Sequence, residues 1–416
     1  MAIPLITVRI TYSYLGNEVY GLWMSITTFF ALFSFSDLGI GNGLQTKLSH
    51  ANGLNDTKLC QTLITNTYAL LFIIALFLFI LFVLLFNHID WARLVNANSA
   101  GITDIVNSIV LIIVLSQIFL IPTAIIQRTQ YALQEGYKSN LWLSAGSVLS
   151  LVFIVIASEL NLGKIALIGG ASFIPVIIAG LNILYYFYYD RRDLGFNFKL
   201  IRLPVIKNLL SLGIYFCILS VLTVIGLSMD TFIVAKTASL EDAAWYSILF
   251  RVGAIISGIT TIVCLPLWGA NGEAFARGDF YWIKKNSYKM ARLMVLATVF
   301  ISCIIILSSK FIFKIWLGSG FEFSHMALVG ICLMQVGISF IAPFFMVLNA
   351  LGKIKIQIIM FACYTPVCFF LKYYMSELYG VTIIPYIGFT LYLFIITYTL
   401  IYTKSIFKKL CCNDVK

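Results

Sequence analysis

The stretch that decides the fold is residues 18–59, EVYGLWMSITTFFALFSFSDLGIGNGLQTKLSHANGLNDTKL. After a polar turn it continues through about 18 apolar residues, enough for a helix that crosses a membrane. One acid, Asp37, and three glycines, Gly39, Gly41 and Gly43, lie within the apolar region, and a polar segment closes it. A charged group inside a membrane span is costly, so Asp37 is predicted to be functional.

The composition of the whole chain supports a membrane protein. Of the 416 residues, 61% are hydrophobic and 11% are charged, and the mean hydropathy is +0.98. Soluble domains carry roughly 25% charged residues, which this chain does not reach. Apolar runs such as residues 68–86 are continuous, whereas the strands of a membrane barrel alternate over about 9–11 residues. We therefore predict an all-α integral membrane protein.

Eleven segments are long enough to span a membrane. They lie near residues 19–46, 58–86, 103–133, 138–159, 164–189, 205–236, 241–271, 283–309, 324–350, 354–376 and 380–403. Residues 1–15 are also apolar but too short to cross about 30 Å of hydrocarbon. We interpret them as the remainder of a truncated twelfth span.

The lysines and arginines predict the orientation of these spans. If the loops alternate between the two sides, 20 of the 28 Lys and Arg residues gather on one side and six on the other, with Arg9 and Arg251 inside spans. Cytoplasmic loops carry an excess of Lys and Arg. The side with 20 is therefore predicted to be cytoplasmic, together with the C-terminus. The formal charge of +11 is explained by this bias, so no nucleic-acid partner is expected.

An internal repeat divides the chain. A shift of 223 residues lays Glu18 on Glu241 and Asp56 on Asp279, although a chance alignment is the alternative. Six helices separate the paired positions, so the halves would share one orientation around an axis along the membrane normal. We predict two pseudo-symmetric six-helix lobes around a central cavity, the plan of a transporter. The predicted parts are the N-terminal lobe 1–190, a cytoplasmic linker 191–204, the C-terminal lobe 205–403 and a basic cytoplasmic tail 404–416.

Charged residues inside the spans are the candidate site. Arg9, Asp37, Asp230 and Arg251 would together cost on the order of 10 kcal/mol if they faced lipid, so we expect them in the interior of the bundle. Asp230 and Arg251 lie at similar depth and could pair, and Arg128 lies near the depth of Asp37. One hypothesis is that the arginines bind an anionic substrate while the acids orient them or exchange protons. The alternative for Asp230–Arg251 is a structural salt bridge.

Signatures of enzymes and cofactors are not found in the sequence. The glycines at 39–43 do not have the spacing of a dinucleotide-binding loop and suit a helix end with close backbone approach instead. The nine cysteines show no metal or disulfide spacing, and His50, His88 and His325 are far apart in the sequence. We therefore predict a protein that is not an enzyme and that binds no metal or cofactor.

Three pieces of the chain carry a resemblance to a known family. They are LGNEVYGLW at 15–23, SDLGIGNGL at 36–44 and SHANGLND at 49–56, and the length, the number of spans and YALQEG at 131–136 agree with them. The sequence resembles the Wzx-type O-antigen flippases. These form part of the polysaccharide-transporter branch of the multidrug/oligosaccharidyl-lipid/polysaccharide exporter superfamily.

The resemblance implies a multi-pass carrier of the bacterial inner membrane. Such a protein flips an undecaprenyl-pyrophosphate-linked repeat unit from the cytoplasmic to the periplasmic leaflet by alternating access around a cationic cavity, without a cofactor. Its expected partners are the lipid-linked oligosaccharide and membrane lipid, with a polysaccharide polymerase and a chain-length regulator as further candidates. The matched motif implies importance for Asp37, Gly39, Gly41 and Asn42. Family members have a complete first span, from which this chain departs.

Two other functions remain open from the sequence. An ion-coupled small-molecule exporter of the same superfamily would also make use of buried acids. An O-antigen polymerase or a membrane acyltransferase shares the length and hydropathy. Those enzymes usually need a large outer loop or a histidine-based motif, and this sequence contains neither.

Overall fold

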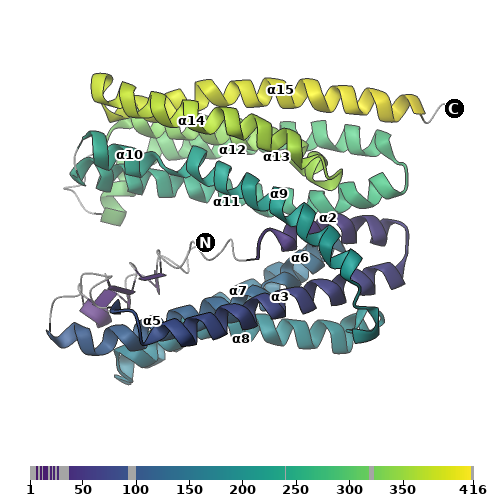
Figure 1. The fold of residues 1–416 in the computed structure, drawn as a ribbon. Helices are drawn as coiled ribbons and strands as arrows, with labels where there is room; N and C mark the ends of the chain where they lie inside the picture. The colour runs from purple at the N-terminus through teal and green to yellow at the C-terminus, as the bar shows by residue number, and fades with distance from the viewer. Residues whose placement is uncertain are drawn as a thin grey trace. The chain divides into compact units, whose positions relative to one another are not determined.

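The computed structural model describes residues 6–7, 10–11, 13–16, 19–20, 22–23, 26–27, 37–91, 100–238, 240–317 and 323–413. All regular elements among these residues are helices, in agreement with the predicted all-α class (Figure 1). The chain divides into two compact units, Met1–Ile214 (unit 1) and Tyr215–Lys416 (unit 2). The predicted bounds of the lobes, which place a linker at 191–204, stay a prediction.

Unit 1 contains the helices before the middle of α9. They are α2 (Ile40–Gly53), α3 (Thr57–Phe86), α5 (Ala100–Thr123), α6 (Ile125–Ala132), α7 (Gly136–Glu159), α8 (Lys164–Tyr185), a π-helical turn η2 (Tyr186–Asp190), two 3-10 turns η3 (Arg192–Leu194) and η4 (Phe198–Leu200), and the first part of α9 (Leu203–Ser228). Helix α8 packs against α5 and α7, and α2 packs against α3 and α6.

Unit 2 contains the remaining elements. They are the rest of α9, α10 (Asp230–Thr237), α11 (Leu240–Ala276), α12 (Phe280–Leu317), α13 (His325–Ala350), α14 (Ile354–Tyr379), η5 (Val381–Ile383) and α15 (Ile384–Asn413). Helix α13 packs against α11, α12 and α15 and is the most buried of the membrane-length helices of this unit. It therefore forms the centre of unit 2.

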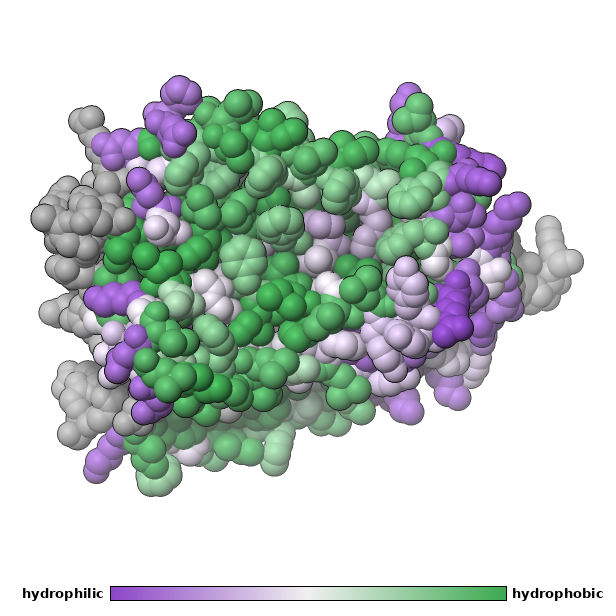
Figure 2. All heavy atoms as spheres, turned by 90° about the horizontal axis from the view of Figure 1, so that it is seen from below, coloured by the Kyte–Doolittle hydropathy of each residue, from purple (hydrophilic) through white to green (hydrophobic). Residues whose placement is uncertain are grey.

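Ten helical segments in the described part of the chain are long and apolar enough to cross a membrane. They match the predicted segments from 58–86 onward. On the face drawn in Figure 2, hydrophobic side chains cover the middle of the helices and hydrophilic ones gather near the helix ends. On α3, Phe72, Phe77 and Leu84 are more than 60% exposed, as expected of side chains that contact lipid.

Three predicted spans are interrupted. The segment 19–46 contains a turn at residues 37–39, and residues 28–36 lie outside the described part of the chain. The segment 103–133 is two helices, because α5 ends at Thr123, just after Pro122, and α6 starts at Ile125. The segment 205–236 is also two helices, since α9 ends at Ser228 and α10 begins at Asp230.

The segment between α8 and α9 is held on unit 1 by side chains of α3. The amide of Asn66 donates to the carbonyl of Leu200 (2.8 Å) and accepts from the backbone N–H of Arg202 (2.8 Å). The amide of Gln61 donates to the carbonyl of Gly195 (2.7 Å). These bonds satisfy backbone groups that the short 3-10 turns leave unpaired. The predicted linker is therefore an ordered part of unit 1.

The internal repeat is present in the backbone geometry. Asn55 (φ 56°) and Gly278 (φ 79°), which are 223 positions apart, both end a helix in the left-handed region. The next residues, Asp56 and Asp279, each begin the following helix and accept a backbone N–H three residues ahead, at 2.8 and 3.0 Å. The predicted alignment of 18–59 with the corresponding part of unit 2 is therefore supported by matching helix caps.

Candidate functional site

Asp37 forms the start of α2. Leu38 (φ 49°) and Gly39 (φ 69°) reverse the chain in the left-handed region. The carboxylate of Asp37 accepts the backbone N–H groups of Gly39 (2.9 Å) and Gly41 (3.3 Å). An anionic group at a helix N-terminus satisfies free donors and interacts favourably with the helix dipole. Asp37 therefore has a structural role in addition to any functional one.

Two of the motif glycines allow helices to approach closely. A Cβ added to Gly41 would lie 2.9 Å from Ile125 Cδ1 and 3.2 Å from both Arg128 Cγ and Asp37 Oδ2. A Cβ on Gly43 would lie 3.3 Å from the carbonyl oxygen of Leu209 on α9. Gly41 thus brings α2 onto α6, and Gly43 brings α2 onto α9.

A glycine outside the predicted motif completes the contact between α2 and α9. A Cβ added to Gly213 would lie 2.8 Å from the backbone oxygen of Leu38. Because backbone atoms cannot move aside cheaply, Gly213→Ala is expected to destabilise the protein by about 1–3 kcal/mol.

Gly180→Ala on α8 is the matched control, since its Cβ would have no neighbour within 4 Å. There, alanine should stabilise the helix by up to about 1 kcal/mol. Thermal unfolding of both variants in detergent measures the difference. Equal stability of Gly213→Ala and the wild type would contradict the tight contact between α2 and α9.

Arg128 lies on α6 and faces a cavity of about 240 Å³ within unit 1. The polar residues of the lining are Asp37, Gln117, Gln127 and Arg128, and the rest of the lining is apolar. The guanidinium donates one hydrogen bond, to Gln45 Oε1 at 3.4 Å. An arginine has five N–H donors, so most of them have no partner among the described residues. Asp37 and Arg128 do not come within ion-pair distance of 4.0 Å, although both side chains border Gly41.

Two amides of α2 are incompletely paired. Asn42 Oδ1 and Gln45 Nε2 are buried and have no hydrogen-bond partner among the described residues. Such groups cost free energy when they stay unpaired. The unpaired nitrogen of Gln45 belongs to the amide that Arg128 contacts, so it leaves a donor available beside the guanidinium. Of the predicted set, the structure brings Asp37 and Arg128 to one cavity, while Asn42 does not line it.

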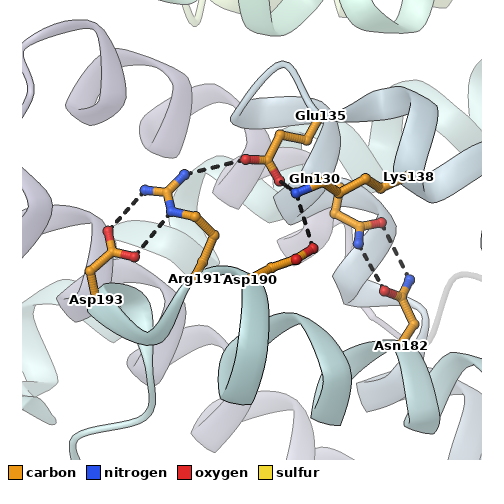
Figure 3. A network of polar contacts seen from close by, with 7 residues as sticks. All are labelled: Gln130, Glu135, Lys138, Asn182, Asp190, Arg191 and Asp193. Carbon is orange, nitrogen blue, oxygen red and sulfur yellow. Dashed lines mark hydrogen bonds and ion pairs between the residues drawn. The ribbon is translucent and has the colours of Figure 1, made fainter.

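Helix α6 is held in position from the side opposite α2. Gln130 and Asn182 are fully buried, and their amides form two hydrogen bonds of 2.8 and 3.3 Å between α6 and α8 (Figure 3). Two buried amides that are joined by two hydrogen bonds can adopt few alternative geometries. Since Arg128 is two residues from Gln130, this pair holds the part of α6 from which the Arg128 side chain extends.

An ion-pair network links the turn between α6 and α7, and the first turn of α7, with the segment that follows α8. Lys138 pairs with Glu135 and with Asp190, both at 3.0 Å, and Arg191 pairs with Glu135 (3.5 Å) and Asp193 (3.0 Å) (Figure 3). The hydrogen bonds from Arg191 hold the pKa of Asp193 below its usual value. Networks of this kind stabilise more than single surface pairs. The network therefore ties the start of α7, the helix that follows the one carrying Arg128, to the segment after α8.

In unit 2 the partner of Asp230 is Lys372 and not Arg251. The Lys372 ammonium on α14 forms a salt bridge with the carboxylate of Asp230 on α10, and Tyr246 donates a hydrogen bond of 3.1 Å to the same carboxylate. Asp230 and Lys372 are 6% and 3% exposed. The pair is thus almost completely withdrawn from solvent and lipid. The predicted Asp230–Arg251 pair is wrong.

The orientation of α11 explains this correction. Tyr246, Leu249 and Val252 of α11 are buried, whereas Arg251 is exposed. Arg251 follows Tyr246 by five residues and so points about 140° away from it around the helix. Arg251 makes no hydrogen bond or ion pair with the described residues, and its role in binding an anion stays a prediction. Arg9 lies outside the described residues.

Lys372 is a functional candidate that was not among the residues predicted from the sequence. The signal was available, because Lys372 lies in the apolar stretch FFLKYYM within the predicted span 354–376. A lysine inside a span needs a partner just as an acid does. In a search limited to the described residues, no cluster of His, Cys, Asp and Glu suited to a metal ion was found.

Solved structures resemble the whole fold. A MATE protein in complex with MaL6 superposes with a TM-score of 0.82 at 13% identity and covers 98% of this chain and 94% of its own. The outward-facing form of a multidrug resistance MATE family transporter of the MOP superfamily superposes with a TM-score of 0.81 at 12% identity, over 98% and 92%. Identities this low establish the fold alone, which is the predicted two-lobe transporter fold.

Sequence relatives cover most of the chain. A candidate O-antigen transporter of Salmonella typhi is 23% identical over 92% of this chain and 88% of its own length. A candidate O-antigen export protein of Yersinia pseudotuberculosis is 24% identical over 84% and 79%. The family model described as polysaccharide biosynthesis protein matches residues 1–266. Because this match covers more than half of the chain, the chain belongs to the polysaccharide biosynthesis protein family.

Proposed function

We propose that this protein is a flippase for a lipid-linked sugar repeat unit of O-antigen or a related polysaccharide. In this proposal the repeat unit is carried on undecaprenyl pyrophosphate and passes from the cytoplasmic to the periplasmic leaflet of the bacterial inner membrane. The relatives named for O-antigen transport or export, and the transporter fold, support the substrate class. Sugars and a pyrophosphate cannot cross hydrocarbon unaided, which is why such a carrier is needed.

The observation that carries the proposal is the incompletely paired Arg128. A guanidinium with free donors on a cavity inside a membrane protein is suited to bind phosphate oxygens through two parallel hydrogen bonds. Gln45 and the anchored α6 orient it, and Asp37 is engaged with the start of α2. Arg128 would therefore hold the pyrophosphate while the polyprenyl tail stays in lipid. Arg9 and Arg251 are further candidates for this anion.

The orientation of the chain is part of the proposal. The end of the helices with most of the Lys and Arg residues, including the C-terminus, would face the cytoplasm. The repeat unit would then meet the protein from the leaflet on which it is assembled. Alternating access of the two lobes would release it on the other side, where a polymerase and a chain-length regulator are the candidate partners.

A deletion strain tests the function. Its lipid-linked repeat units are treated from outside with a membrane-impermeant sugar oxidant, and surface polysaccharide is quantified. We expect polysaccharide to be lost and the units to accumulate protected on the cytoplasmic leaflet. Units that accumulate in an accessible form would instead indicate a defect in polymerisation. Unchanged polysaccharide would contradict the proposal and favour an ion-coupled exporter of small molecules.

A further inference from the structure

Unit 2 encloses a second cavity that the proposed pyrophosphate site does not use. Its volume is about 440 Å³, within the range of roughly 300–1,000 Å³ that small-molecule sites usually have. The lining comes from α9, α10, α11, α13, α14 and α15, which are all the α-helices of this unit except α12. The cavity is only partly enclosed. It is therefore large enough and accessible enough to hold a ligand.

The cavity carries no net charge. Its acid is Asp230 and its base is Lys372, and these two groups form the buried salt bridge with each other. A bound anion would compete with the carboxylate for the ammonium, and a bound cation would compete with the ammonium for the carboxylate. A ligand without charge disturbs neither. The charges therefore favour a neutral ligand.

Gln335 supplies a free donor in this cavity. Only 6% of the residue is exposed, and its carbonyl oxygen accepts a hydrogen bond from the hydroxyl of Ser257. Its amide nitrogen has no partner among the described residues, whereas a buried amide normally has both ends paired. Since Gln335 lines the cavity, a ligand acceptor such as a hydroxyl oxygen can complete the bonding of this nitrogen.

The rest of the lining matches a molecule with both hydroxyl groups and carbon–hydrogen faces. Ser228, Ser257 and Thr261 contribute hydroxyl-bearing residues to the lining, and Phe250, Ile331 and Ile338 contribute apolar ones. An acyl chain would leave the Gln335 amide unpaired, at a cost of about 1–3 kcal/mol. A sugar ring has alternating hydroxyls and apolar faces and leaves no charge to neutralise.

We propose that this cavity binds one uncharged sugar residue of the transported repeat unit, with the Gln335 amide nitrogen donating to a sugar hydroxyl. The inference rests on the proposed function and adds a place where the glycan itself is recognised. Arg128, the proposed ligand of the pyrophosphate, belongs to unit 1, and Gln335 belongs to unit 2. Selectivity among repeat units with different sugars would come from the site at Gln335.

Binding of the free glycan tests this proposal. Mild acid releases the glycan from the lipid-linked units of the deletion strain, and equilibrium dialysis measures its binding, after tritium labelling, to the full-length protein in nanodiscs. The decisive variant is Gln335→Glu, which keeps an acceptor for Ser257 and removes the NH2 donor. We expect affinity to fall about 5- to 10-fold or more. Gln335→Leu should bind no better.

Gln357→Glu is the matched control. Gln357 is also a buried amide of unit 2 (2% exposed), it donates to Asn349 at 2.8 Å, and it does not line the cavity. We expect its glycan affinity to equal that of the wild type. Wild-type affinity in Gln335→Glu, or equal losses in both variants, would overturn the sugar site. So would the failure of the wild-type protein to bind the free glycan saturably.

The outcome is separable from that of the proposed function. Arg128→Gln should bind the free glycan like the wild type, because the released glycan has no pyrophosphate, and should lose affinity for the intact lipid-linked unit. If the deletion strain retains its polysaccharide, the flippase proposal fails. If polysaccharide is lost but Gln335→Glu binds glycan normally, the flippase proposal stands and the sugar site does not.

Discussion

Replacing Arg128 with alanine is expected to lower surface polysaccharide by at least about tenfold in a deletion strain that carries the variant. Hydrogen bonds to a charged group are worth about 1.5–3 kcal/mol, which corresponds to roughly a 10- to 150-fold change in affinity. Arg128→Lys should give an intermediate result, because lysine keeps the charge but loses the planar fork that binds two oxygens at once. Polysaccharide is quantified relative to the amount of each variant in the membrane.

Arg202→Ala is the matched control for this substitution. Arg202 is an exposed arginine just before α9, and the hydrogen bond of 2.8 Å to Asn66 comes from its backbone N–H. Alanine therefore keeps this bond, and polysaccharide should stay at the wild-type level. If Arg128→Ala reaches the membrane in normal amounts and restores full polysaccharide, Arg128 does not bind the substrate. Thermal unfolding of Arg128→Ala separates loss of binding from loss of the contact with Gln45.

Lys372→Met should destabilise the protein by about 3–5 kcal/mol, the largest stability effect we expect. The substitution leaves the carboxylate of Asp230 buried without its cation, and among the described residues the Tyr246 hydroxyl is then its remaining side-chain donor. Replacing both charges, as in Asp230→Asn with Lys372→Met, should restore most of the stability, because no uncompensated charge remains. The stability of both variants is measured by thermal unfolding. The readout is the reaction of buried cysteines such as Cys368 with a thiol dye as they become exposed.

Lys236→Met on α10 is the matched control, because it removes a lysine that is not buried. Lys236 is exposed and forms no salt bridge with the described residues, so its removal should change stability by less than about 0.5 kcal/mol. A Lys372→Met protein as stable as the wild type would contradict the buried pair. A double variant less stable than Lys372→Met would show that Asp230 has a further stabilising partner.

The spans could be predicted from the sequence because they depend on length and hydropathy alone. A continuous apolar run such as 68–86 must form its backbone hydrogen bonds within the segment, and only a helix does this for a single segment in lipid. The internal repeat was visible for a similar reason. Asp56 and Asp279 occupy the same cap position, which a local rule of helix starts requires.

The breaks within spans were harder to predict. Hydropathy continues through Asp230 and past Pro122, so the segments 205–236 and 103–133 are uniform by composition. In the structure α9 ends at Ser228 and α5 ends at Thr123. A helix can stop inside a membrane only where neighbouring groups bond the backbone N–H and C=O groups that its end leaves unpaired and pair any charged side chain there. Those neighbours come from distant parts of the chain.

The sequence by itself determined the class of this protein, an all-α membrane protein with a repeated organisation, and it identified Asp37, Asp230 and Arg251 as charges inside spans that should face the interior of the bundle. Only the tertiary structure decided the partners. Lys372 is 142 residues from Asp230 along the chain. Arg251 was predicted at the depth of Asp230, but it points away from the buried side of α11 that carries Tyr246. Hydropathy gives the depth of a side chain in the membrane, whereas pairing also depends on the rotation of each helix and on which helices pack together.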